Sequence, residues 1–515
     1  MVDMKPLTTS IYTFCDLIAG GYLYVDKTAN IYELIKGYKG QYFLARPRRF
    51  GKSLLISTLK SIFLGQRELF EGLAIADCDY DWKTYPVIHL DLGTAAAQTV
   101  EELERTLTYL IDDQAALYDI KLSREGYSDR FKELISLLTN DGKKVVLLVD
   151  EYDKPLLGHL EKPTAPEIQR VLKEFYSVIK TTEPQQRFVL LTGVSKFSKV
   201  SIFSDLNNLT DLTMSRKAST LLGYTQQELE DNFPEYITEL SKEIGKSYDE
   251  TLSDLREWYN GYRFEESAPT IYNPVSVMKC FDELKFKNYW FETGSPSFLI
   301  NMMRKNPIDL DNLTANEEEF STYEPNHLAT LPLLVQTGYL TIKDVTQLNR
   351  RRSFRLGFPN FEIEESFSHW LALDFTCLPP QELSGTLQKL YYALNEGRIE
   401  DVLELFKVFF SQIPNNITLQ YEKYYQTIFF TVFKLIGAMV DTEVNTNTGR
   451  IDAVIKTPKD IFIFEFKLHG TTEEAMAQIH QKQYATPYRD DARRITLIGV
   501  EFNADERNIT NWLIE

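Results

Sequence analysis

The stretch Tyr42–Thr58, which reads YFLARPRRFGKSLLIST, constrains the fold of this chain more than any other. Its apolar start, Tyr42–Leu44, predicts a short buried strand, and the apolar periodicity from Leu54 to Phe63 predicts a helix. Gly51-Lys52-Ser53 lies between them. This order is that of a phosphate-binding loop, in which backbone N–H groups at a helix start face an anion. We therefore expect the first half of the chain to fold around this loop.

The residues of the loop have distinct expected roles. Lys52 would add positive charge for the outer phosphates of a nucleotide, and Ser53 would offer its hydroxyl to Mg²⁺. Arg46 stands where G-x-x-x-x-G-K-[ST] has its first glycine, and a bulky residue there needs a different turn. The alternative is a chance Gly-Lys-Ser at a helix start. The residues expected to bind the nucleotide here are Arg49, Phe50, Gly51, Lys52 and Ser53.

Two later apolar runs end in polar residues that suit the same site. Val145–Val149 predicts a central parallel strand, and the carboxyl end of such a strand is where open α/β sheets place ligands. Asp150 would complete the Mg²⁺ shell, and Glu151 would orient or deprotonate the attacking water. A third strand, Phe188–Leu191, leads to Thr192, which is placed to sense a γ-phosphate. Together the three segments predict an ATP site.

The remaining elements of the first 224 residues predict an α/β fold. Residues 86–92 predict a strand, whereas Val100–Leu117 and Phe131–Leu138 predict amphipathic helices. Alternating strands and helices indicate a parallel sheet covered on both sides. Near the N-terminus, Thr28 is expected as the N-cap of a helix through Ile31 and Leu34.

Strand signals stop at about Tyr224, and a helical lid is predicted over 225–327. Thr225 and Glu228 predict a capping box, and Asn273-Pro274 predicts the start of another helix.

A winged-helix-like module is predicted over 328–376, followed by a helical connector over 377–414. Three arginines in its wing, Arg350–Arg352, could straddle a phosphate backbone, although packing within the chain is the safer interpretation. A further basic run spans 489–494. The expected elements of the module are a helix over 328–338, strands over 339–345 and 353–358, and a helix over 362–375.

A second site is predicted in GRIDAVIKTPKDIFIFEFK, residues 449–467, where two β-rich runs flank a turn. If Lys456 pairs with Ile461, Asp452 lies directly opposite Glu465, since each lies four residues beyond that pair. Opposed carboxylates are destabilising unless a cation lies between them.

A divalent metal is the natural cation for this patch, because Mg²⁺ binds one or two carboxylates together with waters and phosphate. Period 2 places Lys467 on the same face, where it could position the attacking water. Glu422 lies on the apolar stripe of a helix predicted over 421–436 and needs a partner, which the metal patch could supply. In a later helix, 472–484, Gln478 and Lys482 share a face from which they could reach the substrate, although solvent exposure is the favoured interpretation. A strand follows over 495–500.

This helix–hairpin–helix–strand order, with Glu422, Asp452 and Glu465-Phe466-Lys467, resembles the PD-(D/E)xK nuclease superfamily. The phosphate loop and the Asp-Glu strand resemble the AAA-ATPase-like module of bacterial proteins that carry such a nuclease domain at the C-terminus. The resemblance implies that Asp452 and Glu465 are metal ligands, Lys467 the catalytic lysine and Glu422 an accessory acid. Gln478 and Tyr484 match a helix motif of these domains, and Ile451 replaces the usual proline before Asp452.

Composition and charge limit the classes of function and the cellular location that the sequence allows. A net charge of −18 argues against a protein that coats nucleic acid non-specifically, but it allows local basic patches. The four cysteines are scattered, which fits a reducing cytosol and hence a cytoplasmic location. No apolar run approaches the roughly 18 residues of a membrane helix, so no membrane association is expected.

The sequence thus predicts an α/β multidomain protein: a P-loop NTPase parallel sheet, a helical lid, a winged-helix-like region and a C-terminal restriction-endonuclease-like α/β domain. Its expected domains are 1–224, 225–327, 328–376, 377–414 and 415–515.

The leading hypothesis is an ATP-dependent or ATP-regulated nuclease that hydrolyses DNA with Mg²⁺, or with Mn²⁺ in its place. DNA is preferred to RNA as the partner, and a homo-oligomer stays open. One alternative is a nucleotide-dependent switch or assembly ATPase whose nuclease-like domain only binds nucleic acid. Another is a nuclease with an inactive ATPase, motivated by Arg46.

Overall fold

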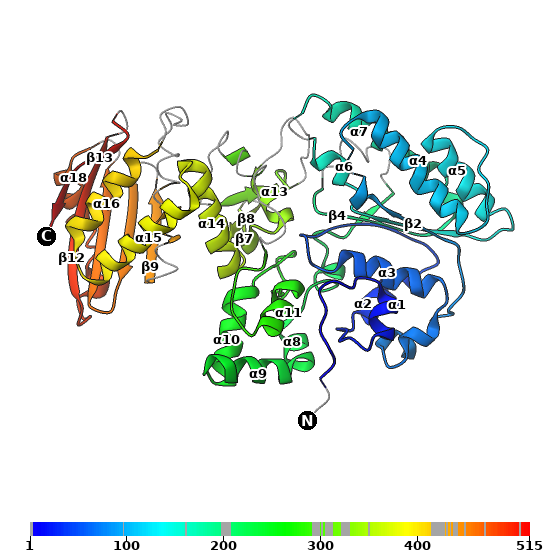
Figure 1. Cartoon of the computed structure of the whole chain (residues 1–515), viewed down its shortest axis with the longest axis horizontal. Helices are drawn as coiled ribbons and strands as arrows, with labels where there is room; N and C mark the ends of the chain where they lie inside the picture. Colours follow the sequence, from blue (N-terminus) through cyan, green and yellow to red (C-terminus); the bar gives the residue numbers. More distant parts are fainter. Residues whose placement is uncertain are drawn as a thin grey trace. The chain divides into compact units, whose positions relative to one another are not determined.

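The computed structural model (Figure 1) divides into two compact units, which we describe separately: Met1–Trp290 with Ala315–Asn360, and Phe291–Thr314 with Phe361–Glu515. The residues that the structure describes are 4–95, 97–159, 162–196, 208–290, 313–320, 330–348, 351–413, 441–447, 450–467, 470–503 and 506–515, and the single positions 299, 302, 303, 428, 431, 432, 434 and 435.

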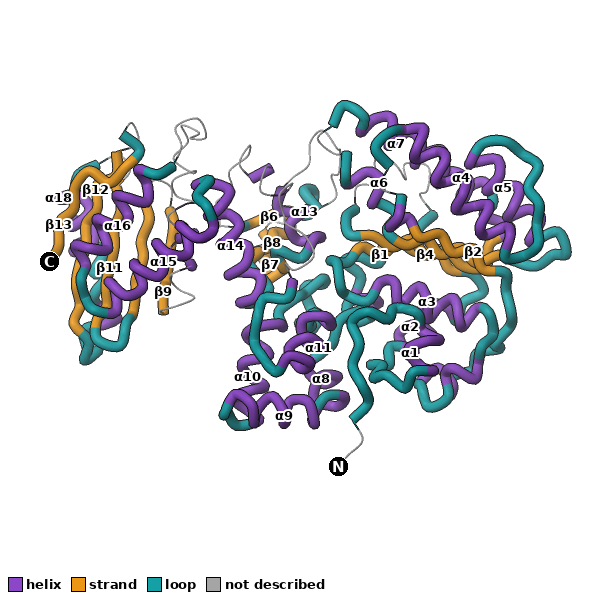
Figure 2. The backbone as a smooth tube through the Cα atoms, viewed as in Figure 1, coloured by secondary structure: helices purple, strands orange, loops and turns teal. Residues whose placement is uncertain are grey.

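A five-stranded parallel sheet forms the centre of the first unit, with strand order β2-β3-β4-β1-β5 (Figure 2). All six residues of β3 are buried, because the Val/Leu run is covered on both faces. The structure confirms the four expected strands, extended by one or two residues at some ends, and adds the short β5. The strands are β1 (Gly40–Ala45), β2 (Val87–Asp91), β3 (Val145–Asp150), β4 (Gln186–Gly193) and β5 (Thr210–Asp211).

Helices cover both faces of this sheet, as expected for an α/β fold. One face carries α1 (Phe14–Ala19), α2 (Thr28–Ile35) and α3 (Lys52–Phe63) (Figure 2). The other carries α4 (Val100–Ala116), α5 (Tyr127–Leu138), α6 (Lys154–Leu157) and α7 (Ala165–Thr181). Short 3₁₀ turns are η1 (Arg67–Phe70), η2 (Ala74–Asp77), η3 (Leu92–Thr94), η4 (Glu183–Gln185) and η5 (Arg216–Ala218).

Four helices follow the sheet, which confirms the change to helical structure after Tyr224. The expected capping box is present, with the Thr225 hydroxyl and the Glu228 carboxylate accepting each other's backbone N–H groups. Asn273 caps α11, accepting a hydrogen bond of 2.9 Å from the Ser276 amide. The helices are α8 (Gln226–Asn232), α9 (Pro234–Ile244), α10 (Tyr248–Tyr259) and α11 (Pro274–Glu283).

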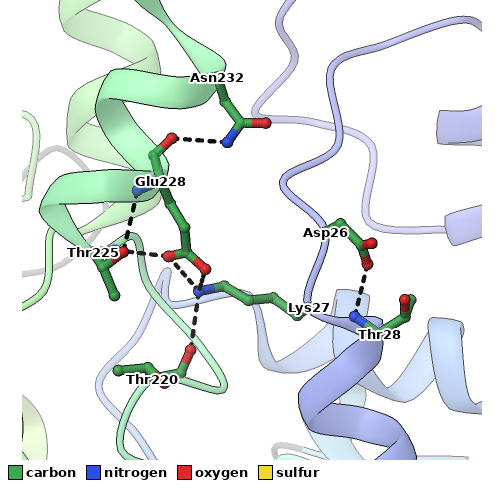
Figure 3. A network of polar contacts seen from close by, with 7 residues as sticks. All are labelled: Asp26, Lys27, Thr28, Thr220, Thr225, Glu228 and Asn232. Atoms are coloured by element: carbon green, nitrogen blue, oxygen red, sulfur yellow. Dashed lines mark hydrogen bonds and ion pairs between the residues drawn. The ribbon is translucent and has the colours of Figure 1, made fainter. Parts of the chain in front are cut away.

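An ion pair joins the N-terminal segment to α8 (Figure 3). The Lys27 ammonium contacts both carboxylate oxygens of Glu228 at 2.6 Å and donates to the Thr220 carbonyl at 2.9 Å. The expectation that Thr28 caps α2 is wrong: Thr28 is the first helical residue, and its amide donates to the Asp26 carboxylate at 2.7 Å. The Asp26 carboxylate thus binds the first amide of α2, and the Thr28 hydroxyl accepts from the amide of Ile75 at 3.0 Å.

The segment after α11 contains the expected helix, strand, strand and helix. A three-stranded sheet has the order β6-β8-β7. Within it Arg352 pairs with Glu266, and Arg355 lies 4.0 Å from Asp344. Packing within the chain is therefore observed for Arg352, whereas Arg350 lies outside the described residues, so the binding of a phosphate backbone by this wing stays a prediction. The elements are β6 (Thr314–Asn316), α13 (Thr330–Thr337), β7 (Thr341–Leu348), β8 (Arg351–Gly357) and α14 (Phe361–Thr376).

The second unit contains a five-stranded mixed sheet of order β13-β12-β11-β10-β9, in which only the β11–β12 pair is parallel. Phe410 of α16 packs edge-on against Phe502 of β12 at 5.1 Å. Strands β9 and β13 were not expected. The elements are α15 (Pro380–Asn395), α16 (Ile399–Ser411), β9 (Asp441–Asn447), β10 (Arg450–Lys456), β11 (Asp460–Lys467), α18 (Thr472–Gln481), η7 (Thr486–Tyr488), β12 (Arg494–Asn503) and β13 (Asn508–Ile514).

Candidate active sites

The phosphate loop connects β1 to α3 as the sequence predicts. Gly51 precedes the first turn of α3 with a left-handed φ of 91°, and Arg49 has a φ of 66°. Left-handed backbone is accessible to glycine at little cost, whereas it is uncommon for arginine. The loop therefore turns at these two residues, and not at Arg46.

Arg46 occupies the first glycine position with its side chain turned into the protein. Its guanidinium donates to the carbonyl oxygens of Ala45 at 2.9 Å, Thr213 at 2.7 Å and Ala218 at 2.8 Å. It also lies 4.2 Å from the centre of the Phe264 ring. Burial lowers the pKa of Arg46 to about 9, which leaves the guanidinium protonated at neutral pH. A bulky residue is tolerated because it has an interior place of its own.

The expected nucleotide-binding side chains converge at the carboxyl edge of the sheet. Strand β4 lies between β1 and β3, which brings Thr192 beside Asp150. Asp150 accepts hydrogen bonds from Ser53 at 2.6 Å and from Thr192 at 2.5 Å. The buried Lys52 ammonium donates to the carbonyl oxygens of Arg46 at 3.1 Å and Pro47 at 2.9 Å. Burial lowers the pKa of Lys52, and the carboxylate of Asp150 opposes that shift.

Glu151 follows Asp150 at the end of β3, in a left-handed conformation with a φ of 51°. This conformation is sparsely populated for glutamate and is found most often at functional sites. Its carboxylate is partly exposed and lies 3.7 Å from the Lys154 ammonium. A carboxylate with access to water beside Asp150 is suited to orienting a water molecule.

Two of the expected loop residues use their side chains elsewhere. Arg49 donates to the carbonyl of Tyr289 at 2.8 Å. Phe50 is buried, with its ring edge-on to Tyr262 at 4.8 Å and Phe264 at 5.6 Å. These contacts anchor the loop to the helical region and leave only the backbones of Arg49 and Phe50 for a nucleotide.

In the second unit, the strand register is the expected one. Lys456 pairs with Ile461, and Asp452 lies opposite Glu465. The backbone of Asp452 is placed in β10, but its side chain lies outside the described part of the structure. Glu422 also lies outside the described residues.

The described members of this site form a hydrogen-bonded chain. Lys467 contacts the buried Glu465 carboxylate at 3.1 Å and donates to the Gln478 side-chain oxygen at 2.5 Å. The Gln478 amide in turn donates to the Tyr484 hydroxyl at 3.3 Å. The expectation that Gln478 is solvent-exposed is wrong, since it is buried, whereas Lys482 is exposed.

A glycine explains why Gln478 is buried. Gly499 of β12 pairs with Glu465 of β11, and α18 packs above it. A Cβ atom at Gly499 would lie 2.9 Å from the carbonyl oxygen of Thr472 in α18. The glycine thus permits a close approach that brings Gln478 to Lys467. The sequence signal that could have revealed this contact is the single glycine inside a predicted strand.

The chemistry of both sites suits a hard divalent cation. Ser53 and Asp150 offer oxygen atoms alone, as does Glu465, and oxygen donors are those that Mg²⁺ and Mn²⁺ prefer. Among the side chains that the structure describes, no group of three or more His, Cys, Asp or Glu residues gathers to hold a metal. Asp452 and Glu422 are not among those side chains.

The basic run over 489–494 is partly neutralised. Arg493 pairs with Asp491 at 2.6 Å, and Arg494 lies 2.7 Å from Asp460. Hydrogen bonds from Arg493 lower the pKa of Asp491 to about 2.

Comparison with known proteins supports both halves of this description. Residues 8–203 match a family described as "Predicted AAA-ATPase", and residues 420–512 match the PD-(D/E)XK nuclease superfamily. The whole chain is 36% identical to an uncharacterized protein in the vnfD 5' region of Azotobacter chroococcum mcd 1, of which it covers 99%.

Two solved structures of Aeropyrum pernix also match parts of the chain. The ORC2 protein in ADPNP–ADP complexes is 13% identical with a TM-score of 0.29, and the match covers 71% of this chain and 93% of that one. The ORC1 protein in complex with DNA is 12% identical with a TM-score of 0.21, and the match covers 66% of this chain and 91% of that one. None of the helices in the described ranges combines the length and apolar character that a bilayer crossing needs.

Proposed function

Because this chain belongs to the predicted AAA-ATPases that carry a C-terminal PD-(D/E)XK nuclease superfamily domain, we propose that it is an ATP-dependent or ATP-regulated nuclease that hydrolyses DNA with a divalent metal. The observation that carries the proposal is the chain of contacts from Glu465 through Lys467 to Gln478, placed across from Asp452 in the strand register.

In the ATPase half, each side chain has a defined task. Lys52 would exchange its bonds to the loop carbonyls for phosphate oxygens, and the hydroxyl of Ser53 and the carboxylate of Asp150 would hold Mg²⁺. Glu151 orients the attacking water, and Thr192 fixes Asp150 from the neighbouring strand. Since Arg46 turns away from the loop, its size gives no reason to regard the ATPase as inactive.

In the nuclease half, Glu465 and Gln478 hold the Lys467 ammonium from two sides. A lysine held in this way can orient a water molecule and stabilise negative charge that develops on a phosphate. Asp452 and Glu465 would hold Mg²⁺ or Mn²⁺, which supplies a water of lowered pKa and neutralises phosphate charge. Glu422 is proposed as the accessory acid.

The division of labour along the chain is also a proposal. Residues 1–224 would hydrolyse ATP, the helical lid 225–327 would sense the nucleotide, and 415–515 would cleave DNA. The winged-helix-like segment 328–376 and the connector 377–414 would transmit closure of the lid. Anchoring of Phe50 among the aromatic residues of the lid supports coupling between the loop and the lid.

The test is cleavage of single- and double-stranded DNA by the full chain with Mg²⁺ or Mn²⁺, with and without ATP. We expect Asp452→Ala and Lys467→Met to lower the cleavage rate by about 100-fold or more, because a metal ligand or the charged group is lost. Lys52→Ala should abolish ATP hydrolysis and any response of cleavage to ATP. Lys459→Met, which removes an exposed lysine from the turn between β10 and β11, is the matched control. ATP turnover without cleavage by the wild type under every condition would contradict the proposal.

A further inference from the structure

A pocket of about 240 Å³ lies beside the phosphate loop and is lined by three cationic side chains. Arg48 comes from the phosphate loop, whereas Lys154 and Lys162 come from the segment that follows β3. Gln98 adds a polar side chain to the wall, and His159 adds its ring. Among the described residues that line the pocket, none is acidic. In a chain of net charge −18, such a concentration of positive charge requires an explanation.

The wall of this pocket is held in place by a buried histidine. His159 donates through Nε2 to the carbonyl oxygen of Ala97 at 2.7 Å, and its Nδ1 lies 2.7 Å from the Thr164 hydroxyl. These bonds tie the loop after β2 to the segment after β3. The pocket therefore has one fixed wall, around the buried His159, whereas Arg48 and Lys162 are exposed and Lys154 is half-buried. Cations grouped around a concave site with a fixed wall are suited to hold an anion.

The pocket is distinct from the nucleotide site that it borders. Among the described lining residues, none belongs to the group expected to hold the triphosphate and its metal, namely Gly51, Lys52, Ser53 and Asp150. Two residues nevertheless connect the two sites. Arg48 lies four residues before Lys52, and the Lys154 ammonium lies 3.7 Å from the carboxylate of Glu151.

We infer that this pocket binds a backbone phosphate of the nucleic-acid strand. Lysine and arginine side chains supply most of the affinity of proteins for nucleic-acid backbones, and such contacts are independent of base sequence. A phosphate in the pocket competes with Glu151 for Lys154. Binding of the strand would thus release the Glu151 carboxylate to orient water, so that occupancy of the pocket raises the rate of ATP hydrolysis. The identity of the ligand depends on the proposed function, whereas the presence of the pocket and its charges does not.

The experiment measures binding of a fluorescent single-stranded oligothymidylate to the full chain, in EDTA and without ATP, over a series of salt concentrations. The double variant Lys154→Gln/Lys162→Gln removes two pocket charges. Lys132→Gln/Lys180→Gln removes two exposed charges from other helices of the same unit and is the matched control. We expect the pocket variant to bind at least about tenfold more weakly, and its slope of log K against log salt to fall by about 0.7, the value for one phosphate of a single strand. Stimulation of ATP hydrolysis by the oligonucleotide should disappear in the pocket variant.

A second arm titrates inorganic pyrophosphate against the same variants in a Lys52→Ala background, which removes the phosphate-loop lysine. Equal oligonucleotide affinity and salt slope in the pocket and control variants would overturn the inference. Loss of pyrophosphate binding alone would also overturn it and assign the pocket to small free anions. A wild type that binds the oligonucleotide through the pocket but never cleaves DNA would refute the proposed function and leave this inference intact.

Discussion

Replacing Gly499 by alanine tests whether close packing of α18 on β12 maintains the nuclease-like site. An added Cβ would lie 2.9 Å from the carbonyl oxygen of Thr472, 3.2 Å from the Cβ of Ala475 and 3.3 Å from the amide nitrogen of Met476. Gly499 does not have a left-handed φ, so the strain is steric alone. Two of these three contacts involve the backbone of α18, so the helix itself must move by a few tenths of an ångström. Overpacking of this kind costs about 1–3 kcal/mol.

The consequence for the site follows from the position of Gln478 on the same helix. Its side-chain oxygen accepts the 2.5 Å hydrogen bond from Lys467, and a displaced helix lengthens that bond. Lys467 then keeps Glu465 as a partner but is oriented less well. We expect Gly499→Ala to lower the DNA cleavage rate about tenfold while metal affinity stays near that of the wild type.

Two measurements check this prediction: thermal unfolding of the full chain, and cleavage at saturating metal. For a unit of this size, each kcal/mol lowers the unfolding temperature by about 2–4 °C. The control is Gly385→Ala in α15, where an added Cβ meets nothing within 4 Å and should stabilise the helix by about 0.5–1 kcal/mol. An unchanged unfolding temperature in Gly499→Ala would refute the packing argument. A lowered temperature with full cleavage would show that the Gln478 contact is dispensable.

The remaining predictions concern the ATPase site. Arg46→Met leaves three carbonyl oxygens without their donor and should therefore lower the free energy of unfolding of the first unit by about 2–4 kcal/mol, measured by urea unfolding. The control Arg105→Met, on the exposed face of α4, should change that free energy little. An equal effect of both substitutions would contradict this role for Arg46. ATP affinity should weaken as the pH rises. Burial lowers the pKa of Lys52 from 10.5, so in the free protein the Lys52 ammonium loses a proton below pH 10.5, and it must regain that proton to bind phosphate. Calorimetric titration from about pH 7 to about pH 9.5 measures the slope, which Lys52→Arg should abolish; a slope retained in that variant would assign the proton elsewhere.

Local sequence signals predicted those features of the fold that depend on neighbouring residues. The Val145–Val149 run predicted a strand buried on both faces, because five consecutive apolar residues leave no polar side for solvent. Counting from the turn was enough to place Asp452 opposite Glu465, because a hairpin fixes its own register. The capping box of Thr225 and Glu228 needed only their spacing.

Contacts between distant segments were not predictable in the same way. The burial of Gln478 depends on Gly499, which lies in a strand that meets α18 only in the folded chain. The cap of α2 was assigned to Thr28, but its hydroxyl accepts from the amide of Ile75, a residue that only the folded chain brings near. Strand β9 carries Asn and Thr in place of a long apolar run, so its pairing with β10 gave no strong signal in the sequence. The roles of all the candidate site residues, among them Asp452, Glu422 and Glu151, stay predictions.

The buried guanidinium of Arg46 also has a consequence for the order of folding. The backbone amide of Arg46 donates to the carbonyl of Gly193, and its guanidinium needs carbonyl partners that follow it by 167 and 172 positions. Contacts of such long sequence separation form late, since the chain must first close a large loop. During synthesis from the N-terminus, the loop cannot reach its final shape until Ala218 has left the ribosome. A nascent chain shorter than this would therefore carry the complete Gly-Lys-Ser motif without a finished binding site for ATP.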